Sequence, residues 1–174
     1  MIVVLIGYMA SGKSTIGRQL ASKLGFSFID LDSYIEEQEL LSISDIFNKK
    51  GEIYFRKKES EYLNEIINGE QNNIVLSLGG GTPCYADNIA LLLNDKSILT
   101  IYLKVGLDEI VNRLGNEKYK RPLVAHIETR EDLKDFIRKH LFERSLYYEQ
   151  SNIKIHTDHN SAKEVVEKII LQLY

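Results

Sequence analysis

The chain has few residues of several kinds, and each shortage excludes a class of protein. Its 174 residues include one cysteine, two prolines and no tryptophan. Because a lone Cys84 cannot form an internal disulfide, we expect a protein of the reducing cytoplasm. No run of about 18 uncharged apolar residues is present, which argues against a transmembrane helix. The apolar run Ile2–Ile6 is too short for a signal peptide, so we expect none.

Neither sign of charge is in large excess. The 22 basic residues stand against 25 acidic ones, which gives a formal net charge of −3. Proteins that bind nucleic acid carry a basic surface, so we expect neither a nucleic-acid partner nor a membrane partner. The four histidines lack the spacing of metal ligands and are interpreted as surface or satisfied core residues. With 44% hydrophobic residues, the length predicts one packed domain.

Strand-like and helix-like segments alternate along the chain. Continuous apolar runs predict buried strands at residues 2–6, 28–29, 74–76, 98–103 and 153–155. Helical patterns lie between them: one ended by Gly25, one at 33–39, one capped by Ser44 that ends near Gly51, and others at 52–68, about 129–148 and 161–173. The alternation predicts an α/β fold with a parallel sheet covered by helices on both faces. Ligands of such sheets bind beyond the carboxyl ends of the strands.

A phosphate-binding loop is predicted directly after the first strand. Residues Gly7–Ser14 read GYMASGKS and match the pattern G-x-x-x-x-G-K-[ST]. In such loops backbone N–H groups and a helix N-terminus hold phosphates. Lys13 can reach the β and γ phosphates, and the Ser14 hydroxyl can ligate Mg²⁺. The alternative is a glycine turn that matches by chance.

Two acids follow the second strand. Asp30 and Asp32 have the i, i+2 spacing that places side chains on one side of an extended segment. One acid can hold Mg²⁺ through its waters, and the other can accept a proton from an attacking hydroxyl. The alternative is that Asp32 only caps the helix at 33–39.

Three glycines follow the third strand. Gly79, Gly80 and Gly81 permit a ligand to approach the backbone closely, although a flexible turn is the alternative. Many phosphate-loop proteins carry an acidic metal ligand at this place. None is present here, so Asp30 is the better metal candidate.

Arginines and a polar segment complete the set of candidates. Arg56, Arg121 and Arg144 can bind carboxylates or phosphates with two hydrogen bonds, whereas the alternative for each is a solvated surface charge. The basic, polar segment 116–127 suits a mobile lid that excludes water, and an ordinary exposed loop is the alternative.

In their order along the chain these motifs resemble the shikimate kinase family. The matching pieces are Gly7–Arg18, Phe28–Asp32, Ser44–Phe47, Gly51-Glu52, Phe55-Arg56, Leu78–Gly81, Lys120–Leu123 and Arg144 with Leu146–Tyr148. The resemblance implies a P-loop NTPase-type three-layer sandwich, with a five-stranded parallel sheet, helices on both faces and a mobile lid. It implies one P-loop kinase domain over 1–174, with a substrate-binding helical region at about 31–62 and a lid at about 115–128.

The resemblance also implies an activity. Such enzymes transfer the γ-phosphate of ATP, with Mg²⁺, to the 3-hydroxyl of shikimate in the pathway to chorismate and the aromatic amino acids. They act in the cytoplasm, and the family expectation is a monomer. Two other functions stay open: a kinase for gluconate or a nucleoside monophosphate, and a non-catalytic ATP-binding module.

Roles for single residues follow from the same resemblance. The catalytic residues would be Lys13, Asp32 and Arg121. ATP would be bound by Gly7, Ala10, Ser11, Gly12, Lys13, Ser14, Thr15, Arg113 and Arg121, and Mg²⁺ by Ser14 and Asp30. Shikimate would be bound by Asp32, Phe47, Phe55, Arg56, Gly79, Gly80, Gly81 and Arg144, with Glu59 steadying Arg56.

Overall fold

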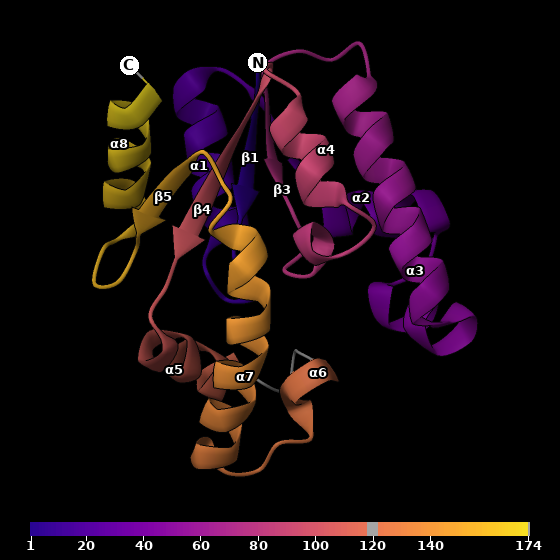
Figure 1. The fold of residues 1–174 in the computed structure, drawn as a ribbon, viewed down its shortest axis with the longest axis vertical. Coiled ribbons are helices and arrows are strands. Elements are labelled where there is room, and N and C mark those ends of the chain that lie inside the picture. Colours follow the sequence, from indigo (N-terminus) through magenta and orange to yellow (C-terminus); the bar gives the residue numbers. More distant parts are fainter. Residues whose placement is uncertain (118–121, 174) are drawn as a thin grey trace.

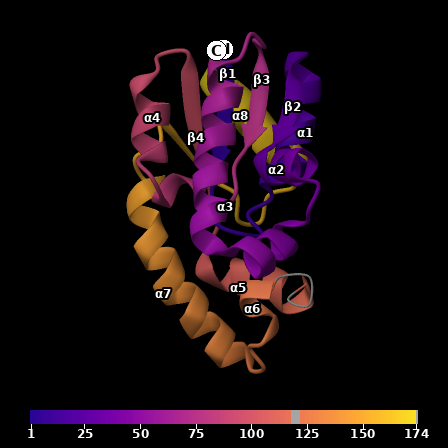
Figure 2. The same cartoon turned by 90° about the vertical axis from the view of Figure 1, so that its right-hand side faces the viewer.

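One parallel sheet runs through the centre of the molecule. The computed structural model describes residues 1–117 and 122–173. Within these residues five strands pair in the order β2-β3-β1-β4-β5 (Figures 1 and 2). They are β1 (Ile2–Ile6), β2 (Ser27–Asp30), β3 (Ile74–Ser77), β4 (Ile98–Lys104) and β5 (Ile153–His156). Each contains one of the apolar runs, so the predicted sheet is confirmed.

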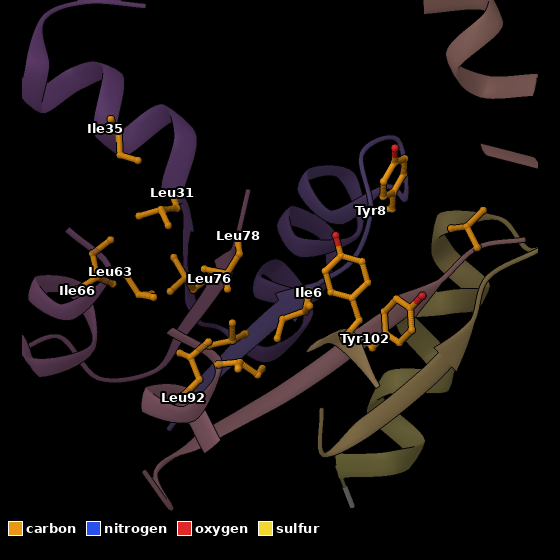
Figure 3. Close-up of a cluster of buried hydrophobic side chains, with 14 of the residues drawn as sticks. Ile6, Tyr8, Leu31, Ile35, Leu63, Ile66, Leu76, Leu78, Leu92 and Tyr102 are labelled. Atoms are coloured by element: carbon orange, nitrogen blue, oxygen red, sulfur yellow. The ribbon is translucent and has the colours of Figure 1, made fainter. Parts of the chain in front are cut away.

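Helices cover both faces of the sheet, as Figure 2 shows from the side. The alternation of side chains along β1 explains this arrangement, because successive residues point to opposite faces. Val3 and Leu5 belong to the buried cluster under α1 (Lys13–Leu24) and α8 (Ala162–Leu173). Val4 and Ile6 belong to the other cluster, drawn in part in Figure 3, which α2 (Leu31–Glu39), α3 (Ile43–Asn68) and α4 (Asn88–Asn94) cover.

Three helices lie beyond the carboxyl ends of the strands (Figure 1). They are α5 (Leu107–Glu117), α6 (Pro122–Ala125) and α7 (Arg130–Tyr148), and the turn η1 (Thr82–Cys84) follows the glycine triplet. The start of α7 agrees with the predicted start near 129, where Thr129 caps the helix. Within residues 1–117 and 122–173, no helix is long and apolar enough to span a membrane.

The helices at 43–68 differ from the prediction in two ways. Ser42 caps α3 rather than Ser44, because the Ser42 side chain accepts a hydrogen bond from the backbone N–H of Asp45. Gly51 does not end a helix but forms a kink inside α3, with a φ of 84°. Glycine adopts this left-handed conformation readily, so two helical segments with different directions are joined there without a loop.

We predict that Gly17→Ala destabilises the fold. A Cβ at Gly17, inside α1, would lie 2.5 Å from Cε2 of Phe28 and 3.2 Å from Cδ1 of Leu5. Overpacking of this kind costs about 1–3 kcal/mol of unfolding free energy, measured by urea denaturation. The matched control is Gly115→Ala in α5, where a Cβ meets nothing within 4 Å. The control should gain about 0.5–1 kcal/mol of unfolding free energy, because alanine favours the helix more than glycine does. Equal stability of the two variants would contradict the packing described for Gly17.

Candidate active site

The loop at Gly7–Ser14 connects the central strand to the first helix. β1 ends at Ile6 and α1 begins at Lys13, so the loop lies at the carboxyl edge of the sheet. Gly12 precedes α1 with a φ of 89°, a left-handed conformation that glycine tolerates. The unpaired N–H groups and the positive dipole end of α1 therefore lie beside the loop, where they can hold phosphate.

Two polar side chains at the start of α1 make defined hydrogen bonds. Lys13 is 9% exposed, and its ammonium donates hydrogen bonds of 2.9 Å to the carbonyl oxygens of Gly7 and Tyr8. The Ser14 hydroxyl donates one of 2.6 Å to Oδ2 of Asp30. The structure thus brings together the hydroxyl and the carboxylate that the sequence selects for Mg²⁺.

The helix cap belongs to Asp30 and not to Asp32. Asp30 ends β2, and its Oδ1 accepts a hydrogen bond of 3.4 Å from the backbone N–H of Ser33 in α2. Asp32 lies in the first turn of α2, so the extended geometry behind the i, i+2 prediction is wrong. Both acids nevertheless face one cavity, because α2 begins directly at the end of β2.

One cavity connects the phosphate loop, the two acids and the glycine loop. Its volume is about 500 Å³. Its wall consists of residues 9–15, Asp30, Asp32, residues 77–80, Arg113 and Asn116. Most of the predicted ATP-binding residues therefore share a wall with Asp32, Gly79 and Gly80, whereas Gly7 and Gly81 lie outside it.

Asp32 lies among charges of both signs. Burial raises the pKa of its carboxyl to about 6, and Asp30 and Glu59 add to the rise. Lys13 and Arg56 act in the opposite direction because they favour the ionised form. A carboxyl that titrates this close to neutral pH can both hold and release a proton under working conditions.

The glycine loop brings its backbone close to charged side chains. A Cβ at Gly79 would lie 2.8 Å from Oδ1 of Asp32, and a Cβ at Gly81 would lie 2.8 Å from both terminal nitrogens of Arg56. Any larger residue would have to displace one of these groups. The triplet is therefore a close-approach segment and not only a flexible turn.

Arg56 is held by a buried acid and an aromatic ring. Its Nη1 donates a hydrogen bond of 2.8 Å to Oε2 of Glu59, a side chain that is 1% exposed. The other oxygen of Glu59 accepts a hydrogen bond of 2.6 Å from the Thr82 hydroxyl. The guanidinium carbon lies 4.1 Å from the ring centre of Tyr85. Because the buried carboxylate has partners on both oxygens, it can fix Arg56 without an unpaired buried charge.

Arg144 reaches the same loop from α7. A Cβ at Gly80 would lie 3.2 Å from Nη1 of Arg144. The two predicted aromatic walls, Phe47 and Phe55, pack with ring centres 4.7 Å apart; Phe55 is buried in the core, and Phe47 is partly buried. Arg56 and Arg144 thus meet at the glycine loop, although neither forms part of the cavity wall.

Arg113 of α5 contacts the phosphate loop. Its Nη1 donates a hydrogen bond of 3.0 Å to the carbonyl oxygen of Ala10, and its Nε donates one of 2.9 Å to Glu109. A smaller cavity of about 190 Å³ is lined by Arg113 together with Thr157 and Asn160 from the loop after β5. The predicted lid residue Arg121 lies outside the described residues.

Sequence reasoning missed several residues of this site. Thr82 had no assigned role, and His140 was treated as an ordinary surface or core histidine. His140 is half-buried, and its Nδ1 lies 2.9 Å from the Tyr8 hydroxyl. Tyr148 is fully buried, and its hydroxyl donates a hydrogen bond of 2.5 Å to the carbonyl oxygen of Gly80. The spacing of four between His140, Arg144 and Tyr148 was the available signal.

The first strand, the phosphate loop and the helix α1 have the arrangement of a P-loop protein. A carboxylate lies in the same cavity as the lysine of that loop, so this protein is a P-loop kinase. The family model for shikimate kinase matches residues 9–174. The chain therefore belongs to the shikimate kinase family.

Relatives and solved structures agree with this assignment. The shikimate kinase of Flavobacterium johnsoniae is 46% identical over 97% of this chain and 96% of its own length. The shikimate kinase of Flavobacterium psychrophilum is 44% identical over 96% of this chain and 95% of its own length. The crystal structure of the shikimate kinase from Bacteroides thetaiotaomicron is 33% identical with a TM-score of 0.89, over 99% of this chain and 98% of that one. The Acinetobacter baumannii enzyme, in complex with shikimate, is 31% identical with a TM-score of 0.87, over 99% and 92%.

We predict that Asp32→Asn becomes more stable than the unchanged chain as pH rises. The pKa of Asp32 is about 6 in the folded protein and lower in the unfolded chain, so folding binds a proton between these values. Ionisation therefore costs stability progressively above about pH 4, and Asn avoids the cost. The gain should reach about 1–3 kcal/mol at pH 8 and vanish near pH 4, measured by urea unfolding.

The control for this prediction is Asp95→Asn. Hydrogen bonds from Ser97 lower the pKa of the partly exposed Asp95 carboxyl, so its ionised form stabilises the fold. The sign should then be reversed: this variant should lose stability relative to the unchanged chain as pH rises. A pH-independent difference for Asp32→Asn would contradict the charge environment described for Asp32.

Proposed function

We propose that this chain transfers the γ-phosphate of ATP to the 3-hydroxyl of shikimate and so forms shikimate 3-phosphate. The observation that carries the proposal is Asp32, a carboxyl of raised pKa in the same cavity as the phosphate-loop lysine, beside a glycine loop that two arginines contact. An acid next to a nucleotide's terminal phosphate suits an acceptor alcohol. Two guanidinium groups suit the carboxylate of a small anionic acceptor.

The phosphate loop would bind ATP. Its backbone N–H groups, from Gly7 to Thr15, would hold phosphate oxygens at the N-terminus of α1. Lys13 would exchange its hydrogen bonds to the loop carbonyls for the β and γ phosphates. The cavity between Arg113 and the loop after β5 would take the adenine, with Thr157 and Asn160 as contacts. Arg121 as a lid residue stays a prediction.

The donor set fits Mg²⁺. The Ser14 hydroxyl and the Asp30 carboxylate share a hydrogen bond of 2.6 Å, and both are oxygen ligands. Among the described residues no group of three or more histidine, cysteine, aspartate or glutamate side chains could hold a metal. Mg²⁺ typically takes one or two protein oxygens and keeps waters and substrate phosphates as its other ligands. When bound, it would neutralise charge on the transferring phosphate.

Asp32 and the two arginines would bind and orient shikimate. Asp32 would accept the proton of the 3-hydroxyl as its oxygen bonds to the γ-phosphorus and the bond to the β-phosphate oxygen breaks. Arg56 and Arg144 would hold the substrate carboxylate near the glycine loop, and Phe47 with Phe55 would wall the ring. Positioning of this kind supplies most of the catalysis in phosphoryl transfer, because little covalent work is needed.

The same proposal covers the organisation of the chain. It describes one P-loop kinase domain over 1–174, with a substrate-binding helical region at about 31–62 and a lid at about 115–128. α2 and most of α3, which carry Asp32 and Arg56, fall in the helical region. A monomeric state and a cytoplasmic location remain predictions.

Acceptor choice is the direct test of the proposed function. We expect ADP release from ATP and Mg²⁺ to depend on shikimate and not on gluconate or AMP, measured with a coupled ADP assay. Turnover with gluconate or AMP instead would favour another small-molecule kinase. ATP binding without transfer to any of the three would favour a non-catalytic module.

Asp32→Asn should separate binding from chemistry. We expect ATP binding close to normal and kcat lowered by ~10²-fold or more, because the variant cannot accept the hydroxyl proton. In the unchanged chain kcat/KM should fall as pH drops through about 6, where Asp32 becomes protonated. Normal turnover of the variant, or an unchanged rate down to pH 5, would remove the role given to Asp32.

A further inference from the structure

One face of α7 contacts both ligand-binding loops. His140, Arg144 and Tyr148 follow one another at intervals of four residues, so they lie along one side of the helix. His140 meets Tyr8 of the phosphate loop, and the Tyr148 hydroxyl meets the carbonyl oxygen of Gly80 in the glycine loop. Arg144, the expected carboxylate ligand, lies between these two contacts in the helix.

Tyr8 contacts the site with both its backbone and its side chain. It is 1% exposed and belongs to the same buried cluster as Ile6 and Tyr102 (Figure 3). Its carbonyl oxygen accepts a hydrogen bond from Lys13, and its hydroxyl shares one of 2.9 Å with Nδ1 of His140. The two rings meet edge to face, with centres 5.6 Å apart at 83°.

The Tyr8 ring forms one wall of the space that Arg144 occupies. The guanidinium carbon of Arg144 lies 5.8 Å from the ring centre of Tyr8, within the range of a cation–π contact. On another side, Nη1 of Arg144 comes close to Gly80, whose carbonyl oxygen is bonded to Tyr148. Arg144 is therefore bounded by one ring that His140 anchors and by one loop that Tyr148 anchors.

We propose that the hydrogen-bonded pair Tyr8–His140 is a positioning device that holds Arg144 in line with the carboxylate of the acceptor substrate. The inference rests on the proposed function, because it gives Arg144 its carboxylate ligand. Neither Tyr8 nor His140 needs to touch the substrate. The pair sets the orientation of the Tyr8 ring, and the ring sets the place of the guanidinium.

The charges around the pair suit this role. Burial, together with the positive charges of Arg144 and Arg56, lowers the pKa of His140 to about 4. Burial also raises the pKa of Tyr8, while Arg144 opposes the rise. Both members are therefore neutral near pH 7, so the pair neither repels Arg144 nor competes with a substrate for it. Their replacement by apolar residues changes no charge in the site.

The test uses Tyr8→Phe, His140→Leu and the double variant in the shikimate assay. Loss of the hydrogen bond should raise the KM for shikimate roughly three- to tenfold, the range of one net hydrogen bond. The KM for ATP should stay unchanged, because the backbone carbonyl of residue 8 is retained. The double variant should show no larger effect than Tyr8→Phe, since both changes break one interaction. The melting temperature of the double variant should stay close to that of the unchanged chain.

Two further variants separate positioning from general destabilisation. In an Arg144→Lys background, Tyr8→Phe should add no further rise in the KM for shikimate, because the pair acts through Arg144. Thr100→Val in β4 removes a partly buried hydrogen bond, 2.7 Å from the Thr100 hydroxyl to Oδ1 of Asn152, and should leave both KM values unchanged. If His140→Leu does not fold, the KM values of Tyr8→Phe, measured with and without Arg144→Lys, test the positioning role by themselves.

The outcomes distinguish this inference from the proposed function. A KM for shikimate that Tyr8→Phe leaves unchanged, or the same rise in the Arg144→Lys background, overturns the positioning role while shikimate kinase activity stands. An equal effect of Thr100→Val also overturns it. Absence of shikimate-dependent turnover in the unchanged chain overturns the proposed function, and the inference falls with it.

Discussion

The parallel pairing of β1 between β3 and β4 is the constraint on which the site depends. Parallel strands end at the same edge of a sheet, so the segments that follow them start close together in space. Asp30 pairs with Ser77, and Leu5 pairs with the same Ser77 from the other side. The phosphate loop, the acids and the glycine loop therefore meet at one edge, although they lie far apart in the chain. The sheet alone therefore places these loops side by side, without the need for contacts between the loops.

Charge balance explains how three acids can share this small region. The Asp30 carboxylate accepts a hydrogen bond from Ser14, and the Glu59 carboxylate accepts hydrogen bonds from Arg56 and Thr82. Asp32 is left with the burial cost and the repulsion of the other two, and its pKa rises. The environment thus divides the acids by role. Asp30 and Glu59 are held by hydrogen-bond donors, and Asp32 is the acid whose pKa is raised enough to exchange a proton near neutral pH.

Much of the fold could be predicted from the sequence because its signals are local. Five apolar runs mark the five strands, and the glycine-rich motif marks the phosphate loop wherever the rest of the chain goes. The cap at Asp30 could not be predicted, because Asp30 and Asp32 both suit a helix N-terminus, and only the end of β2 decides between them. The pairing of Tyr8 with His140 depends on where α7 packs. Residue types alone do not indicate a tertiary contact of that kind.

The division of work between sheet and helices has a consequence for specificity. The phosphate loop and α1 belong to the sheet core and would serve any P-loop kinase. Under the proposed function, the groups that choose the acceptor would come instead from α3 and α7, which bring Arg56 and Arg144 close to the glycine loop. Function in such folds is set by groups placed on a common scaffold. As a carboxylate ligand, Arg144 would need a fixed position relative to the nucleotide. Tyr8 would supply that position, because it belongs to the phosphate loop and its side chain contacts His140 of α7. A change of acceptor would therefore require changes on α3 and α7, whereas the loop that binds phosphate could stay as it is.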